Sequence, residues 1–228
     1  MHIFKTFSIA VLVIILCVSC QKQTTPDNQA KIQNSEVTTN ENTKHVRLEA
    51  KQVIFIRHAE KENEDGTIKD VHLSAKGYIR ANELPDFFMN HLPNEVHKPD
   101  LIIAMKQSHK KSSNRPVETV QPLAKALNIP LYAEYTQGET DLAAKEINQY
   151  GKDKTVLVCW EHEELVKIAK RLGAPVKSWG SNPKAKKSDD NNYDAIWVLT
   201  KTSDDKPVFS VYKQFDIGDN GEILQENR

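Results

Sequence analysis

Short apolar runs alternate with longer segments of helical period along residues 51–228. Runs rich in β-branched residues predict strands, and apolar residues recurring every three or four positions predict helices. The predicted strands are residues 52–56, 100–104, 130–132, 155–160, 194–199 and 207–215. The predicted helices are residues 73–91, 115–127, 139–150 and 162–172. Pro85 should kink or restart the first of these helices. This alternation predicts an α/β fold, a three-layer sandwich whose central sheet is largely parallel and carries helices on both faces.

The first 20 residues have the pattern of a secretory signal. Lys5 precedes an apolar stretch over residues 7–18, which is shorter than the roughly 20 residues of a membrane-spanning helix. The pair Ser19-Cys20 at its end resembles a bacterial lipobox, with Cys17 where leucine is usual. That resemblance implies cleavage before Cys20, a lipid on its sulfur and a membrane-anchored protein of the cell envelope, facing the periplasm or the outer surface. The alternative is an ordinary signal peptide that is cut nearby.

Residues 21–50 are rich in Gln, Asn, Thr and Lys and show no apolar period. Such a segment cannot bury enough apolar surface to offset its ordering entropy, so it is predicted to be a disordered tether. A short helix near residues 44–50 is the alternative. Residues 51–228 then form one domain of ordinary size.

Charge and cysteine content narrow the classes of function. The chain has 31 basic residues (Lys and Arg) and 31 acidic residues (Asp and Glu). Removal of the signal takes away one charged residue, Lys5. This balance argues against a general nucleic-acid binder. Cys159 stands alone in a predicted strand once the leader is removed, which excludes a disulfide framework and fits a small buried hydrophobic residue.

Two arginines and two histidines stand where ligands bind in a parallel α/β sheet. Arg57 and His58 end the first strand, Arg115 opens a helix and His162 follows a later strand. Since ligands bind beyond the carboxyl ends of the strands, these four residues are predicted to form one cationic cup for a phosphoryl group. We use "the cup" for these four residues below.

The chemistry of the cup suits a phosphate ester. His58 can attack phosphorus through a neutral ring nitrogen if its other ring nitrogen donates to a backbone carbonyl. Arg57 and Arg115 have the fork geometry for bidentate contacts to phosphate oxygens. His162, expected to be cationic, would add a donor at the start of a helix, where anions are favoured. The expected intermediate is a phosphohistidine on His58, and neither a metal nor a cofactor is required.

Four segments in this order resemble the histidine phosphatase superfamily, the phosphoglycerate mutase-like clan. They are Ile56-Arg57-His58-Ala59, the stretch Leu73-Ser74-Ala75-Lys76-Gly77-Tyr78-Ile79-Arg80-Ala81, Arg115 four residues before Thr119, and His162 after an apolar strand. The resemblance spans about residues 52–199 and implies a phosphatase acting on a small phosphorylated substrate.

The proton donor is predicted from the same resemblance. Many family members carry the acid as Glu-x-x-x-Gly in the loop after the third strand, and Glu134 fits that spacing. Glu139 and Asp141 are alternatives, and a donor here should have a raised pKa. A small residue usually flanks the second histidine of the family, where this chain has Glu161 and Glu163. Glu163 suits the first turn of a helix. The Glu161 carboxylate either orients His162 or points away.

These observations favour a metal-independent phosphatase anchored to a membrane by lipid. One alternative is a phosphoglycerate mutase-type phosphotransferase, which would need a larger segment to enclose its intermediate. Another is a non-catalytic phospholigand-binding lipoprotein. Residues 60–72 and an exposed insertion, residues 177–192 with Trp179, are expected to shape the entrance.

Overall fold

The computed structural model describes residues 46–61, 71–110, 112–218 and 220–224. Its main sheet has six strands in the order β3-β2-β4-β1-β5-β6. They are β1 (Gln52–Arg57), β2 (Leu101–Ala104), β3 (Leu131–Tyr132), β4 (Thr155–Trp160), β5 (Ala195–Thr200) and β6 (Val208–Lys213). The first four strands are parallel, whereas β5 runs antiparallel to β1 and β6 antiparallel to β5. The predicted, largely parallel sheet is therefore confirmed.

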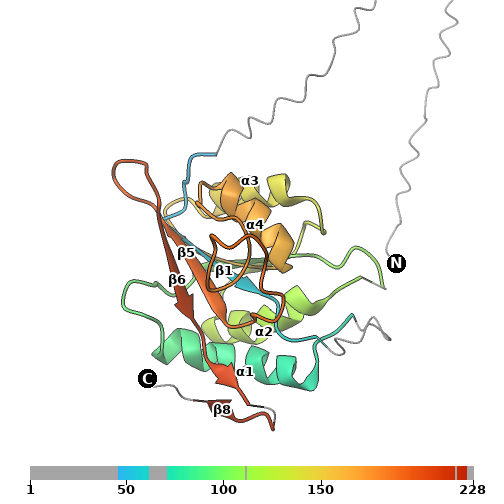
Figure 1. Ribbon diagram of the computed structural model, residues 1–228. Coiled ribbons are helices and arrows are strands. Elements are labelled where there is room, and N and C mark those ends of the chain that lie inside the picture. Colours follow the sequence, from blue (N-terminus) through green and yellow to red (C-terminus); the bar gives the residue numbers. More distant parts are fainter. Residues whose placement is uncertain (1–45, 62–70, 111, 219, 225–228) are drawn as a thin grey trace, which may run out of the picture. The chain divides into compact units, whose positions relative to one another are not determined.

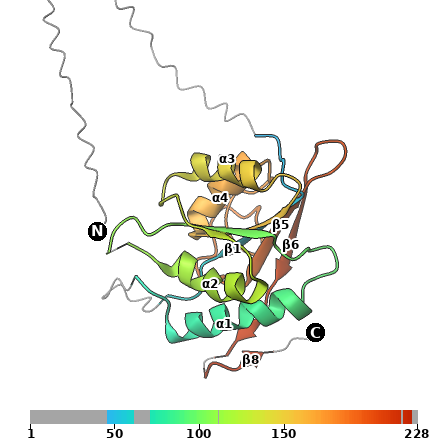
Figure 2. The ribbon, with the colours of Figure 1, turned by 180° about the vertical axis from the view of Figure 1, so that it is seen from behind.

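Four helices cover the two faces of this sheet. They are α1 (Ala75–Asn90), α2 (Arg115–Leu127), α3 (Thr140–Tyr150) and α4 (His162–Arg171). Helices α1 and α2 lie on one face, and α3 and α4 lie on the other (Figures 1 and 2). Strand β1 shows the alternation: Ile54 and Ile56 enter the core under α1 and α2, while Val53 and Phe55 enter the core under α3 and α4. The fold is the predicted three-layer α/β sandwich.

Two prolines lie inside helices that continue through them. Helix α1 begins after Ser74, whose side chain accepts a hydrogen bond from the backbone N–H of Gly77, and it runs past Pro85 as one element. The prediction of a restart at Pro85 is therefore wrong. Helix α2 likewise runs through Pro122. Each proline removes one intrahelical hydrogen bond, but apolar packing on both sides of it outweighs that loss; Leu84 and Phe88, for example, are fully buried.

The domain begins earlier than predicted. The backbone N–H of Val46 donates to the Arg171 carbonyl at 2.9 Å, and Ala50 is fully buried beside Lys152 in an antiparallel bridge. Residues 46–50, assigned above to the tether, therefore pack on the domain and are not helical. The predicted signal and Cys20 lie outside the described residues. Within the described ranges, no helix is both long and apolar enough to cross a membrane.

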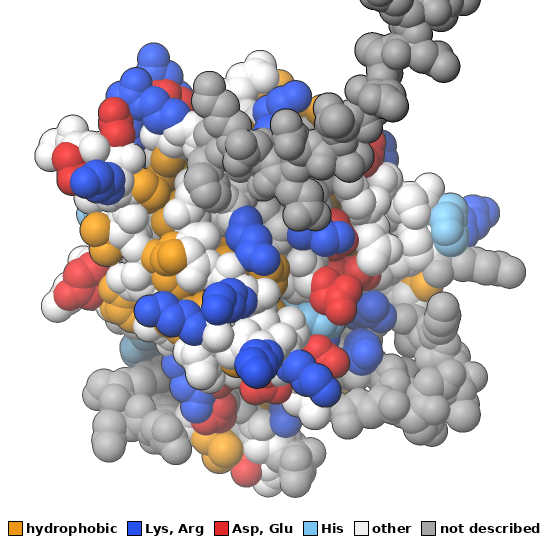
Figure 3. All heavy atoms as spheres, turned by 45° about the horizontal axis from the view of Figure 1, so that its top comes forward, with side chains coloured by type: hydrophobic (Ala, Val, Ile, Leu, Met, Phe, Trp, Pro, Cys, Tyr) orange, Lys and Arg blue, Asp and Glu red, His pale blue; other side chains and the backbone are white. Residues whose placement is uncertain are grey.

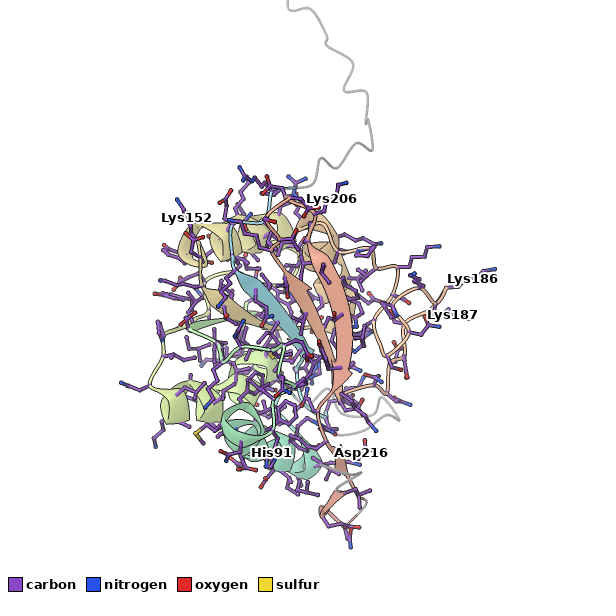
Figure 4. The ribbon with its side chains drawn as sticks, turned by 90° about the vertical axis from the view of Figure 1, so that its left-hand side faces the viewer. His91, Lys152, Lys186, Lys187, Lys206 and Asp216 are labelled. Carbon is purple, nitrogen blue, oxygen red and sulfur yellow. The ribbon has the colours of Figure 1, made fainter. Side chains whose placement is uncertain are left out.

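The insertion at residues 177–192 is anchored by its tryptophan. Trp179 is only 1% exposed, its ring centroid lies 4.6 Å from that of Trp197, and its Nε1 donates to the Asn192 carbonyl. The insertion is exposed over most of its length, as predicted, but Trp179 is an exception because its side chain fills the core under α4. Lys186 and Lys187, by contrast, project away from the domain (Figure 4).

The chain after β6 forms a small two-stranded sheet that the sequence did not indicate. Strands β7 (Asp216–Ile217) and β8 (Ile223–Leu224) pair antiparallel. Their apolar side chains join the core on the α1 side of the main sheet, and the ribbon lies beside α1 (Figure 1). Each strand has two residues, which is too short for a recognisable alternation.

Candidate active site

Sheet topology brings the ends of β1 and β4 together. The strands are parallel neighbours with Arg57 opposite Trp160, and the backbone N–H of His58 donates to the Trp160 carbonyl at 3.1 Å. The chain therefore leaves both strands at the same edge, at His58 on one side and at Glu161 and His162 on the other. Strand β2, the other neighbour of β4, leads through residues 105–114 to the start of α2.

His58 is buried with a defined tautomer. It is 2% exposed, and its Nδ1 lies 2.7 Å from the carbonyl oxygen of Ala59. Because a carbonyl oxygen can only accept, Nδ1 must carry the hydrogen, which leaves the lone pair on Nε2. Burial lowers the pKa of His58 far below its ordinary value, and the positive charges of Arg57, Arg115 and His162 lower it further. His58 is therefore neutral at pH 7, the state in which it can act as a nucleophile.

A threonine on α2 holds Ala59, the residue whose carbonyl orients His58. The backbone N–H of Ala59 donates to Thr119 Oγ1 at 2.8 Å, and the same hydroxyl donates to the Arg115 carbonyl at 2.8 Å. Thr119 thus ties the first turn of α2, where Arg115 lies, to the segment that carries His58. The bond between the Thr119 hydroxyl and the Arg115 carbonyl explains in physical terms why Arg115 lies four residues before Thr119.

The Leu73–Ala81 segment supports the chain just beyond His58. The backbone N–H of Ser74 donates to the Glu60 carbonyl at 2.9 Å, and a Cβ on Gly77 would lie 2.3 Å from that carbonyl oxygen. Only glycine allows this approach. Arg80 Nη2 lies 2.7 Å from Glu60 Oε1 in a buried ion pair. The segment therefore fixes the backbone after His58.

Asp190 contacts two members of the cup, Arg57 and His162, and no feature of the sequence predicted this. Its backbone carbonyl accepts a hydrogen bond from Arg57 Nη1, and its Oδ1 lies 3.0 Å from His162 Nε2. Arg57 also stacks on Tyr193, with Cζ 4.0 Å from the ring centroid. Asp190 comes from the polar, aperiodic part of the insertion, and nothing in such a stretch indicates which residue turns inward.

His162 begins α4, as predicted, and its pKa is lowered when no ligand is bound. Burial is the main cause that lowers the pKa of His162, and the charge of Arg57 acts in the same direction. Asp190 opposes this shift through its charge and its hydrogen bond. In this structure His162 therefore favours the neutral form more than an exposed histidine does. A bound phosphate dianion would favour the cation.

Two of the three acids proposed from the resemblance, Glu139 and Asp141, bind other partners. Glu134 is exposed, and its charge acts on Tyr135 and Glu146. Glu139 accepts hydrogen bonds from the backbone N–H and the hydroxyl of Thr136 at 2.7 and 2.6 Å, and these bonds lower its pKa. Asp141 lies 3.2 Å from Arg171 in an ion pair between α3 and α4. None of these contacts brings an acid to His58.

Glu161 is the carboxylate that the fold places beside the cup. Its Oε2 accepts a hydrogen bond from Gln137 Nε2 at 2.6 Å, and the charges of Arg115 and Arg57 act on it. Burial raises the pKa of Glu161 in spite of these arginines. Gln137 belongs to the loop after β3, in which the acid was expected. Glu161 contacts that loop from the end of β4.

A cavity of about 470 Å³ lies next to the cup. Its lining includes Glu60, Lys61, Lys76, Arg80, Asp189 and Tyr193. The Tyr193 ring lies 6.2 Å from the ring of His58 and also stacks on Arg57, so Tyr193 lines the cavity and contacts the cup. Charged groups of both signs dominate this lining, which favours a polar ligand.

Other features add little to the site. Within the described part of the chain, no three His, Cys, Asp or Glu side chains gather as a metal site. Cys159 is fully buried, and burial raises the pKa of its thiol, as expected of a structural cysteine. Acidic and basic side chains are interspersed on the face seen in Figure 3.

Comparison with solved structures finds similar chains. The protein histidine phosphatase SixA in complex with tungstate has 16% identity and a TM-score of 0.46, over 72% of this chain and 96% of that one. The α-ribazole phosphatase from Shigella flexneri has 12% identity and a TM-score of 0.48, over 72% and 96%. A mycobacterial glucosyl-3-phosphoglycerate phosphatase has 13% identity and a TM-score of 0.44, over 72% and 98%. No family model and no curated protein matches the sequence.

Proposed function

We propose that this protein is a phosphatase that hydrolyses a phosphate monoester through a phosphohistidine on His58. The observation that carries the proposal is the hydrogen bond from His58 Nδ1 to the Ala59 carbonyl at 2.7 Å, in a side chain that is 2% exposed. It leaves Nε2 unprotonated beside two guanidinium groups, whose charges act on the same ring. A neutral imidazole next to fixed cations suits in-line attack on phosphorus.

The reaction has two displacements. Nε2 of His58 bonds to phosphorus while the bond from phosphorus to the leaving oxygen breaks, and the alcohol departs with a proton. Water then attacks the phosphohistidine, and the phosphorus–nitrogen bond breaks to release phosphate. Arg57 and Arg115 balance the charge on the phosphoryl oxygens, and His162 donates to them once phosphate displaces the Asp190 carboxylate.

The test is direct detection of the intermediate. Wild-type protein mixed with a ³²P-labelled aryl phosphate should acquire label that is stable in alkali and lost in acid, as expected of a phosphohistidine. His58→Ala should acquire none, whereas His91→Ala, on the exposed end of α1, should label like wild type. A protein that turns over substrate without labelling, or a labelled His58→Ala variant, would contradict the proposal.

A second candidate is a protein that binds phosphorylated ligands without turnover. The exposure of Glu134 and the contacts of Glu139 and Asp141 with other partners favour it, because an unassisted alkoxide is a poor leaving group. Aryl phosphates need little proton donation, so they separate the two candidates. Binding of phosphate by calorimetry with no hydrolysis of aryl phosphate would establish the binding protein.

We propose further that Cys20 carries a lipid that anchors the protein in the cell envelope. The support is the apolar stretch that ends in Ser19-Cys20. Wild type should incorporate labelled palmitate in bacterial cells and sediment with membranes. Cys20→Ala should lose the label and be released. A Cys20→Ala protein that stays in membranes would indicate anchoring by the uncleaved apolar segment.

A further inference from the structure

Hydrolysis of an alkyl phosphate needs a proton donor for the leaving oxygen, and the structure leaves that role open. The requirement rests on the proposed function, because a binding protein needs no donor. Glu139 and Asp141 bind local partners. Glu134 is exposed, and its charge acts on Glu146 of α3. A carboxyl group that is held at the edge where His58 leaves β1 is better placed for this role.

The position of Glu161 meets this requirement. It directly follows Trp160, which lies opposite Arg57 in the sheet and accepts a backbone hydrogen bond from His58. Glu161 is the N-cap residue of α4, but its side chain makes no capping hydrogen bond. Its backbone has the extended conformation usual for an N-cap residue, with φ of −74° and ψ of 145°, and the absence of a capping bond leaves the carboxyl group available for other partners.

One hydrogen bond and four charges define the surroundings of that carboxyl group. Gln137, from the loop after β3, donates to Oε2 at 2.6 Å. Arg115 on α2 and Arg57 on β1 attract its negative form, whereas Glu163 and Glu164 on α4 repel it. The two arginines also act on His58, so the carboxyl group and the nucleophile share the same cationic neighbours.

Burial is the largest influence on the pKa of the Glu161 carboxyl group, and it raises that pKa. The negative charges of Glu163 and Glu164 raise it further. A carboxyl group with a raised pKa holds a proton at higher pH than an exposed glutamate, which a general acid needs. This favours the same assignment as the position beside the cup.

We propose that Glu161 is the general acid of the phosphatase, positioned by Gln137. In the first step its carboxyl proton passes to the leaving oxygen as the bond from phosphorus to oxygen breaks. In the second step the resulting carboxylate accepts a proton from the attacking water as the bond from phosphorus to nitrogen breaks. The carboxyl group is then protonated again, and the cycle closes.

The test uses leaving groups of different basicity. Glu161→Gln should lower the turnover of an alkyl phosphate by 100-fold or more, because an alkoxide must then leave without a proton. With 2,4-dinitrophenyl phosphate, Glu161→Gln should phosphorylate His58 within a few-fold of the wild-type rate. Turnover should then slow at the water step, which gives a burst of dinitrophenol and a lasting phosphohistidine.

Matched variants and a pH profile complete the design. Glu95→Gln, an exposed residue between α1 and β2, should behave as wild type with both substrates. Gln137→Ala should lower alkyl phosphate turnover less than Glu161→Gln does. The fall in wild-type alkyl phosphate activity at higher pH should disappear in Glu161→Gln.

Three results would overturn the assignment: an equal slowing of His58 phosphorylation by the two substrates in Glu161→Gln, full alkyl phosphate activity in that variant, or the leaving-group signature in Glu134→Gln instead. Circular dichroism of each variant checks that it folds. A wild type that neither hydrolyses aryl phosphate nor labels His58 would instead refute the proposed phosphatase, so the two failures are distinct.

Discussion

The carboxylate of Asp190 lies 3.0 Å from Nε2 of His162, and the backbone carbonyl of Asp190 accepts a hydrogen bond from Arg57. One acidic residue thus occupies two donors that the proposed reaction assigns to phosphoryl oxygens. The Asp190 side chain is 74% exposed, so it can leave without exposing apolar core. Phosphate and this carboxylate should therefore compete for His162.

Removing the carboxylate should strengthen the binding of phosphate. Asp190→Ala is expected to lower the inhibition constant of inorganic phosphate by about 3- to 10-fold, a range typical of a largely exposed charge contact. Asp190→Asn keeps a side chain that can hydrogen-bond and should give a smaller change. Competitive inhibition against an aryl phosphate measures both variants. Unchanged or weaker inhibition by phosphate in Asp190→Ala would show that the carboxylate does not compete.

Thr119 should matter for the rate although it contacts no reacting atom. Thr119→Val keeps the shape but leaves the backbone N–H of Ala59 without its acceptor, so the carbonyl that holds His58 Nδ1 loses its support. We expect phosphorylation of His58 to slow by about 10- to 100-fold, in line with misplacement of a reacting group. Thr119→Ser keeps the hydroxyl and should stay within a few-fold of wild type.

Nitrogen NMR of His58 separates positioning from general damage in these variants. Wild type and Thr119→Ser should show the proton on Nδ1, whereas Thr119→Val should show a mixture of tautomers. A slow Thr119→Val variant with the wild-type tautomer would mean that Thr119 acts in another way.

The pKa of His58, lowered mainly by burial, predicts a pH dependence of stability. In the unfolded chain this histidine takes up a proton as the pH falls through about 6.5, whereas the folded protein resists protonation there. The unfolded state then binds more protons, so the free energy of unfolding should fall by about 1.4 kcal/mol per pH unit below 6.5. This contribution is fully present above pH 6.5 and is lost toward the folded pKa.

His58→Asn isolates that contribution, because asparagine does not titrate. Urea unfolding of both proteins between pH 5 and 7.5 should show the stability of wild type falling faster with acid than that of the variant. Parallel curves would mean that His58 becomes protonated in the folded state as easily as in the unfolded one. The charges of Arg57, Arg115 and His162 face this ring and would have to move for that to happen.

The sequence predicted the sheet and the cup because both depend on local signals. Apolar period and strand ends are visible along the chain, and parallel strands bring His58 and His162 to one edge. The acid was harder to predict, since its partners come from distant segments. Glu161 meets Gln137 only because the loop after β3 folds across the end of β4. Asp190 reaches His162 because Trp179 anchors its insertion in the core, and neither contact has a period or spacing.

The ion pair between Arg80 and Glu60 should contribute more to stability than a similar pair on the surface. Arg80 Nε and Nη2 lie 2.7–3.1 Å from the Glu60 carboxylate, Nη1 donates to the Phe215 carbonyl, and the two side chains are 5% and 11% exposed. Arg80→Leu would leave a buried carboxylate without a countercharge, at about 3–5 kcal/mol. Adding Glu60→Gln should recover part of that loss.

Arg47 and Asp205 form the matched surface pair. They lie 2.9 Å apart, but their side chains are 64% and 49% exposed, so Arg47→Ala should cost less than about 1 kcal/mol. Urea unfolding at pH 7 measures all of these variants. Equal losses for Arg80→Leu and Arg47→Ala would show that water reaches the Glu60 carboxylate, and the Leu73–Ala81 segment would then have to hold the backbone after His58 by its hydrogen bonds to the Glu60 carbonyl alone.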